Sequence, residues 1–155
     1  MKSEQGWYTI SNILIRLHKS SQAENLYKIH LDKSSSSEEH MACNDGLRAI
    51  YHPMGDYAKA LSSYERSLEI MNITLPPNHP DLATSYSNIG AVYAGMGEYT
   101  KALKSYERLL AISKIVLPLN HPDIARHYNN FGVVHDHMDE YSKALVYHQN
   151  ASNMD

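Results

Sequence analysis

NHPDLATSYSNIGAVYAGMGEYTKALKSYERLL, residues 78–110, returns with substitutions as NHPDIARHYNNFGVVHDHMDEYSKALVYHQNA at residues 120–151. Corresponding residues lie 42 positions apart, beginning with Asn78 and Asn120. The identical pairs include Pro80/Pro122, Asp81/Asp123, Tyr86/Tyr128, Asn88/Asn130, Gly90/Gly132, Tyr99/Tyr141, Ala102/Ala144 and Leu103/Leu145. A fixed period of this size predicts a repeat protein in which each unit packs mainly on its neighbours.

Two earlier units fit the same pattern. KALSSYERSLEI at residues 59–70 matches KALKSYERLLAI at residues 101–112 at nine of twelve positions. The first half of that unit is degenerate, because Arg48 stands in the place of Gly90. Further upstream, WYTISNILIRLHKSSQAENLYKIHL at residues 7–31 follows the pattern again. We therefore predict a single array over residues 1–155, with units at residues 4–33, 38–75, 79–117 and 121–155.

The spacing of apolar residues predicts two helices per unit. Tyr86, Ile89 and Tyr93 recur at i, i+3 and i+7, which places them on one face of a helix. The small residues Gly90 and Ala102 allow two such helices to cross closely. Helices are expected near residues 5–17, 20–32, 39–53, 57–74, 80–96, 99–116, 122–138 and 141–152.

Three features of the individual units carry further expectations. Arg48 should either splay its hairpin or turn outward, since it replaces a glycine at the crossing. Gly55 and Gly97 should close the first helices of their units, where the other two units have His18 and Asp139. In the last unit, two histidines should take the packing places of tyrosines, and this should weaken that unit. They are His135 in the place of Tyr93 and His148 in the place of Tyr106.

Composition favours a soluble protein of the cytoplasm. The chain is 43% hydrophobic and 20% charged, with no run of apolar residues long enough for a signal peptide or a membrane span. A single cysteine excludes an internal disulfide framework. The net charge of −3 provides no basic surface for nucleic acid. Neither a membrane nor a nucleic acid is therefore an expected partner.

Sequence motifs for catalysis are missing. No nucleophile elbow, phosphate-binding glycine loop or dinucleotide fingerprint is present, so neither an enzyme nor a bound cofactor is predicted. Ten histidines raise the question of a metal, but no HExxH motif or cysteine partner accompanies them, and no metal site is predicted. His79 and His121 belong to the repeated turn and are interpreted as structural.

The spacing of residues within one unit resembles that of the tetratricopeptide repeat (TPR). An aromatic residue is followed by an aliphatic residue at +3, a small residue at +4, an alanine at +16 and a second aromatic residue at +20. Tyr86, Ile89, Gly90, Ala102 and Tyr106 fill these places. The longer unit and the NHPD turn are similar to the repeats of kinesin light chains. This resemblance implies an all-α fold, a right-handed α-solenoid of four TPR hairpins, with a concave groove that binds a protein or peptide partner.

The resemblance also implies which side chains bind. In kinesin light chains, asparagines at the positions of Asn88 and Asn130, and less directly Asn129, contact a cargo peptide. An asparagine amide both donates and accepts hydrogen bonds, so it suits the backbone of an extended peptide. Arg126 is a candidate for binding a carboxylate, and Asn12 and Arg16, with Tyr8, are expected to face the groove in the first unit. Hydrogen bonds within the hairpins remain the alternative for the asparagines, and a solvated surface cation the alternative for Arg126.

The predicted function is a non-catalytic interaction scaffold. Two alternatives remain: the repeat segment of a larger enzyme such as an arginine ADP-ribosyltransferase, and a cargo adaptor like a kinesin light chain. The degenerate second unit would interrupt a cargo groove of the motor type. We also expect self-association through the last unit, because Leu145 and its neighbours have no following repeat to cover them.

Overall fold

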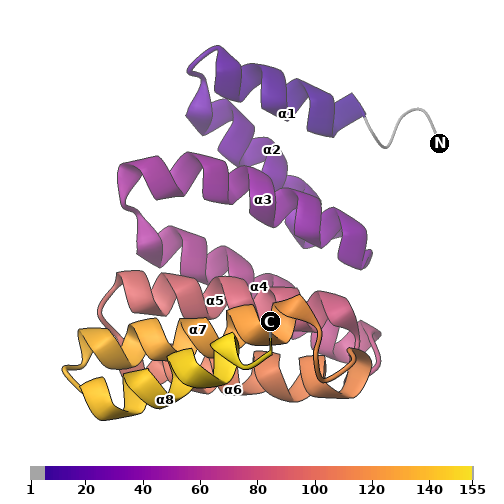
Figure 1. Ribbon diagram of the computed structural model, residues 1–155. Coiled ribbons are helices and arrows are strands. Elements are labelled where there is room, and N and C mark those ends of the chain that lie inside the picture. The colour runs from indigo at the N-terminus through magenta and orange to yellow at the C-terminus, as the bar shows by residue number, and fades with distance from the viewer. Residues whose placement is uncertain (1–5, 155) are drawn as a thin grey trace. The chain divides into compact units, whose positions relative to one another are not determined.

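The computed structural model describes residues 6–154, which form eight α-helices and no strand (Figure 1). The helices are α1 (Gly6–Arg16), α2 (Ser20–Lys33), α3 (Ser37–Met54), α4 (Tyr57–Thr74), α5 (Pro80–Gly95), α6 (Tyr99–Val116), α7 (Pro122–His137) and α8 (Tyr141–Ser152). Every predicted helix is present, with ends at most two residues from those expected, and the all-α solenoid fold class is confirmed. The predicted unit ends at residues 4 and 155, and the predicted helix start at residue 5, lie outside the described residues.

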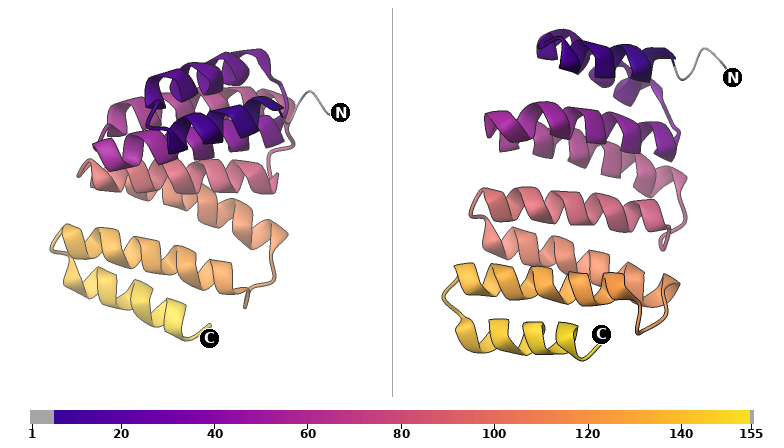
Figure 2. Two further views of the ribbon diagram at one scale, coloured as in Figure 1. Left: turned by 90° about the horizontal axis from the view of Figure 1, so that it is seen from above. Right: turned by 45° about the horizontal axis from the view of Figure 1, so that its top comes forward.

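The chain divides into two compact units, with the boundary between Thr74 and Leu75. The first contains helices α1–α4 and the second contains helices α5–α8. Each unit consists of two hairpins, and the second helix of one hairpin packs on the first helix of the next: α2 on α3, and α6 on α7. In both views of Figure 2, the helices of the second unit follow one another in chain order, from pink to yellow.

The crossing of helices within a hairpin depends on small residues, as predicted. A Cβ atom added at Gly90 would lie 2.5 Å from the ring of Tyr106, so α5 and α6 touch at this point. Gly132 has the same relation to the ring of His148, again at 2.5 Å. Ala102, on the other side of the first crossing, is fully buried. A larger side chain at any of these positions would force the two helices apart.

The degenerate third helix packs differently from its counterparts. Arg48 is exposed, so its side chain has turned outward, and α3 packs less closely on α4 than α5 does on α6. Its closest approach is instead to α2, where a Cβ atom on Gly46 would overlap the ring of Tyr27. Asn44 is buried there, and its Oδ1 accepts no hydrogen bond from the described residues. Gly46, the small residue of this helix, therefore allows close contact with the preceding hairpin.

The turn between the two helices of each hairpin contains one residue in the left-handed conformation. These residues are His18 (φ 57°), Gly55 (φ 67°), Gly97 (φ 76°) and Asp139 (φ 60°). The expected role of both glycines is confirmed, and the other two turns keep the same geometry without glycine. This conformation costs an L-residue about 1–2 kcal/mol, so the first and last turns store strain that the middle two avoid.

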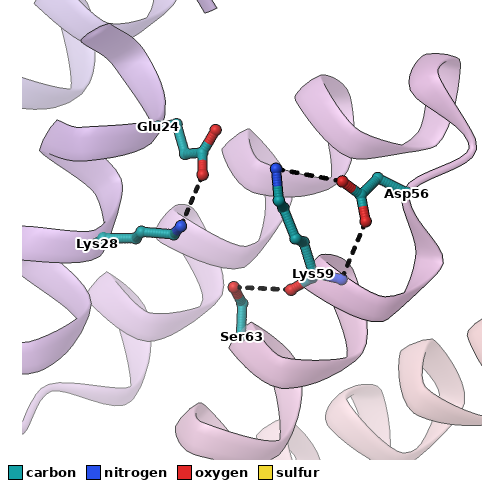
Figure 3. Close-up of polar contacts among 5 residues, drawn as sticks. All are labelled: Glu24, Lys28, Asp56, Lys59 and Ser63. Carbon is teal, nitrogen blue, oxygen red and sulfur yellow. Dashed lines mark hydrogen bonds and ion pairs between the residues drawn. The ribbon is translucent and has the colours of Figure 1, made fainter. Parts of the chain in front are cut away.

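Polar contacts fix the start of α4 and the exposed side of α2 (Figure 3). The Oδ1 atom of Asp56 accepts a hydrogen bond from the backbone N–H of Lys59 at 3.3 Å, and its Oδ2 atom lies 3.2 Å from the Lys59 ammonium group. Asp56 therefore caps the first turn of α4. On α2, the Lys28 ammonium group donates to Glu24 at 2.6 Å, and this hydrogen bond lowers the pKa of the Glu24 carboxyl group.

Substituting Ala102 by tryptophan should destabilise the second unit severely. The indole ring would have to enter a crossing with no free space, and such overpacking costs about 1–3 kcal/mol or more. Lys104→Ala, two residues along the same helix, changes only an exposed side chain and should be nearly neutral. Urea unfolding followed by circular dichroism measures both. Equal shifts of the two midpoints would show that the register of α6 is wrong.

Gly97→Ala should lower the free energy of unfolding by about 1 kcal/mol through backbone strain alone. A Cβ atom at Gly97 would meet nothing within 4 Å, so steric overlap cannot contribute. Gly6→Ala is the matched control, because space at Gly6 is equally open and no positive φ is required there. The control should be neutral or slightly stabilising. If both alanines had the same effect in thermal unfolding, the strain assigned to this turn would be absent.

Candidate functional site

A groove in the second unit lies between the N-terminal halves of α5 and α7 and the C-terminal half of α6. Its volume is about 420 Å³. It is lined by Pro80, Ala83, Thr84, Ser87 and Asn88 of α5, Leu109, Ser113, Val116 and Leu117 at the end of α6, and Asp123, Arg126 and His127 of α7. Stacking of the two hairpins forms this groove, because successive first helices expose the sides not used for packing. Two predicted site residues, Asn88 and Arg126, meet here.

The α5 wall of the groove provides hydrogen-bonding groups that the protein does not use. Asn88 is half-buried, and its amide makes no hydrogen bond to any described residue. The same is true of the neighbouring Ser87 hydroxyl. On the previous turn, the Thr84 hydroxyl donates to the Pro80 carbonyl at 3.4 Å. Asn88 therefore offers both a donor and an acceptor to a molecule in the groove.

The opposite wall is mostly apolar and comes from the end of α6. Leu109 is buried, while Val116 and Leu117 retain partly exposed surface. A hydrocarbon group placed against them would leave water at about 25 cal/mol for each Å² that it buries. The groove thus combines an apolar wall with a polar one, an arrangement common to ligand-binding sites.

Charge at the α7 side of the groove is balanced by an ion pair. The Arg126 guanidinium lies 3.0 Å from the Asp123 carboxylate, one turn earlier on the same helix. Arg126 is largely exposed, so the pair is solvated and contributes little to stability. An incoming carboxylate can therefore bind Arg126 in competition with Asp123 at low cost.

His127 is a buried residue of the groove, and the sequence did not predict this position for it. Its Nδ1 atom is buried and has no hydrogen-bond partner among the described residues. Burial lowers the pKa of the His127 imidazole, and the adjacent Arg126 guanidinium acts in the same direction. Periodicity could have predicted its burial, because His127 takes the place of Ser85, which is buried in α5.

The remaining predicted residues lie outside this groove. Asn130 is on α7 one turn after Arg126, half-buried and without a hydrogen bond to the described residues. Asn129 lies within hydrogen-bond distance of His148 across its own hairpin, with 3.1 Å between Oδ1 and the ring Nδ1. Asn12 and Arg16 belong to the first unit. Asn12 accepts a hydrogen bond from the Tyr27 hydroxyl at 3.2 Å, and Arg16 is exposed at the end of α1.

Both histidines of the repeated turns cap helices, a role the sequence left unspecified. The Nδ1 atom of His79 accepts a hydrogen bond from the backbone N–H of Asp81 at 3.2 Å. His121 and Asp123 repeat this contact at the start of α7, again at 3.2 Å. Each cap satisfies one free N–H group of the first helical turn. The structural interpretation of these histidines is confirmed.

The last hairpin uses two histidines where the third uses tyrosines. His135 is buried in the place expected from Tyr93, and its Nδ1 atom lies 2.6 Å from the Glu140 carboxylate. His148 approaches Gly132 as Tyr106 approaches Gly90, with its Nε2 atom 3.1 Å from Asp136. Both packing places predicted for these histidines are confirmed.

The described part of the chain gives no support for a reactive cysteine, a metal site or a membrane span. Burial raises the pKa of the Cys43 thiol to about 12, so the thiol stays protonated at neutral pH and is a poor nucleophile. Between residues 6 and 154 no three histidine, cysteine, aspartate or glutamate side chains gather closely enough to hold a metal ion. None of the described helices combines the length and the apolar character that crossing a membrane requires.

Comparison with known proteins agrees with the repeat pattern. The model of the tetratricopeptide repeat family matches residues 41–115 and, in a second overlapping match, residues 88–155. No curated protein sequence matches the chain. Among solved structures, BtubC (BKLC) from P. vanneervenii has a TM-score of 0.77 and 20% identity over 96% of this chain.

Two further solved structures show the same fold. Repeats from Podosopora anserina, described as nearly identical TPR-like repeats of a kinesin light chain, have a TM-score of 0.72 and 17% identity over 95% of this chain. The apo form of RapI has a TM-score of 0.75 and 20% identity over 96% of this chain. This chain spans 61% of BtubC, 72% of the P. anserina chain and 54% of RapI. At such identities the likeness concerns the fold alone.

His127 should make the second unit less stable in mild acid. Its pKa is depressed in the folded state, so the unfolded chain binds the proton more tightly. The corresponding stability is present above the unfolded pKa of about 6.5 and is lost as the pH falls through the folded value. His127→Phe should reduce the difference between urea midpoints at about pH 8 and about pH 5.5. Val133→Ala alters an exposed, non-ionisable side chain of the same helix and should leave that difference unchanged. An unaltered pH dependence in His127→Phe would contradict this assignment.

Proposed function

The chain belongs to the tetratricopeptide repeat family, and from that premise we propose that it is a non-catalytic cytoplasmic scaffold that binds an extended protein segment. Repeats of this family form protein-interaction scaffolds, and the groove of the second unit is our candidate for the binding site. The proposal includes a single array of four units over residues 1–155. The observation that carries it is the Asn88 amide, which faces the groove without a partner of its own.

The bound segment should lie along α5, with its backbone against Asn88. A strand-like peptide presents N–H and C=O groups in alternation, and one asparagine amide can bind both kinds of group. Side chains of the peptide that point away from Asn88 would contact Val116 and Leu117. An aliphatic residue is favoured there because the wall is apolar.

Arg126 and the second asparagine pair would extend this site along α7. Arg126 would bind an acidic side chain or a terminal carboxylate in place of Asp123. Asn130 supports the proposal because its amide is unbonded, whereas Asn129 would first have to leave His148. In the first unit, Arg16 is exposed and Asn12 would have to release Tyr27, so we propose a secondary role for both.

We further propose that the chain self-associates through the outer side of α8. Leu145 is 57% exposed there, and Tyr141, one turn earlier, is 65% exposed. Contiguous apolar surface of this kind commonly marks a site of protein interaction. The role of a kinesin-type cargo adaptor is not adopted, because the similarity to those repeats concerns fold alone.

A display library of random peptides, selected on the immobilised protein, tests the groove. Asn88→Ala should weaken binding of the selected peptides about fivefold, the equivalent of one hydrogen bond worth about 1 kcal/mol. Arg126→Ala should weaken only peptides that carry a carboxylate near the contact. Lys104→Ala, an exposed change on α6 outside the groove, is the control and should bind as the unaltered protein does. Peptides that bind all three variants equally would place the site elsewhere, and failure to select any peptide would contradict the proposed function.

A further inference from the structure

The outer side of α8 corresponds to a surface that is covered in the preceding hairpin. Its residues Tyr141 and Leu145 take the places of Tyr99 and Leu103 on α6. On α6 this side packs on α7, where the Tyr99 ring stacks on His137 with 5.8 Å between centroids. No described residue covers the same side of α8, and both apolar side chains are exposed.

On α1, the described residues leave the opposite face uncovered. Ile10, Ile13 and Leu17 recur at i, i+3 and i+7 and are all exposed, with Ile13 at 49%. Ile10 takes the place that Leu47 has in α3 and Phe131 has in α7. Both counterparts are at most 3% exposed in helices that pack on α2 and α6 respectively.

These two faces are therefore the halves of one repeated interface. Within each of the two described units that interface is present once, as α2 against α3 and as α6 against α7. In each case the second helix of a hairpin supplies one face and the first helix of the next hairpin supplies the other. Resting on the self-association proposed above, we propose that α8 of one copy packs on α1 of a second copy.

The charges of the two helices are compatible with this contact. Arg16 is the one charged side chain of α1 among Lys, Arg, Asp and Glu, and Lys143 is the one on α8. Lys143 is already paired with Glu140 at 2.8 Å. Packing the two helices together therefore removes little charge from water, which keeps the desolvation cost low.

The contact is heterologous, because the two surfaces that meet are different. Each copy keeps one free face of each kind, so association continues into a closed ring or an open chain of copies. A contact between two α8 helices would instead be isologous and would stop at a dimer. This difference allows the two arrangements to be separated by mutation.

Two single variants each block one face. Ile13→Glu places a carboxylate on the α1 face, and Leu145→Glu places one on the α8 face. Both sites are already exposed, so the variants should fold, and circular dichroism confirms this. Ile73→Glu changes an exposed isoleucine at the end of α4 and serves as the control.

Analytical ultracentrifugation over a dilution series measures the mass of each sample against that of one chain, 17.6 kDa. The wild type and Ile73→Glu should grow in mass with concentration beyond a dimer. Ile13→Glu and Leu145→Glu should each remain monomeric. Their equimolar mixture should form a dimer and nothing larger, since only one intact pair of faces remains.

Every other outcome contradicts one part of the proposal. A wild type that stays at the mass of one chain refutes self-association, while peptide selection on the groove tests the scaffold function separately. If Ile13→Glu still dimerises while Leu145→Glu does not, the contact joins two α8 helices. If the mixture stays monomeric although the wild type associates, the α8 and α1 faces do not meet.

Discussion

The close crossing of two helices at a small residue is the constraint on which each hairpin depends. At Gly90 the backbone of α5 lies against the Tyr106 ring, and the space has no room for a Cβ atom. The first hairpin meets the same requirement with Ser11, which is fully buried and donates its hydroxyl to the Trp7 carbonyl at 2.9 Å. Where Arg48 replaces the small residue, the side chain turns outward and the two helices pack less closely.

The repeat pattern predicted the fold well because its signals are local and occur several times. Helix ends follow from residues such as Pro80 and Gly97, whose backbone preferences do not depend on distant contacts. The role of Gly46 was missed because its partner, Tyr27, belongs to the preceding hairpin and lies outside the repeat comparison. The capping by His79 was missed because histidine is an uncommon cap, and only atomic positions show its Nδ1 atom accepting a hydrogen bond.

The site was predictable to a smaller extent, since side-chain pairing decides which groups are free. Asn88 and Asn129 are both predicted to bind a partner, yet only the amide of Asn88 is unbonded and lines the groove. His148 accounts for the difference. It replaces a tyrosine at the crossing and brings ring nitrogens within reach of Asn129 and Asp136. A substitution made for packing in one helix thus changes what its neighbour can offer to a ligand.

The hairpin of α7 and α8 combines a polar contact near its interior with apolar side chains on its outer side. Its buried His135 pairs with the partly exposed Glu140 at the start of α8, and the His135 ring stacks on Tyr147 with 5.2 Å between centroids. Its outer side contains Tyr141 and Leu145, both exposed. The hydrophobic effect favours covering such a surface, and the repeated contact of α6 with α7 shows which kind of helix covers it in this protein. The outer side of α8 therefore has the properties of an internal repeat surface, and the stacking of hairpins that builds the fold also provides the geometry for its continuation.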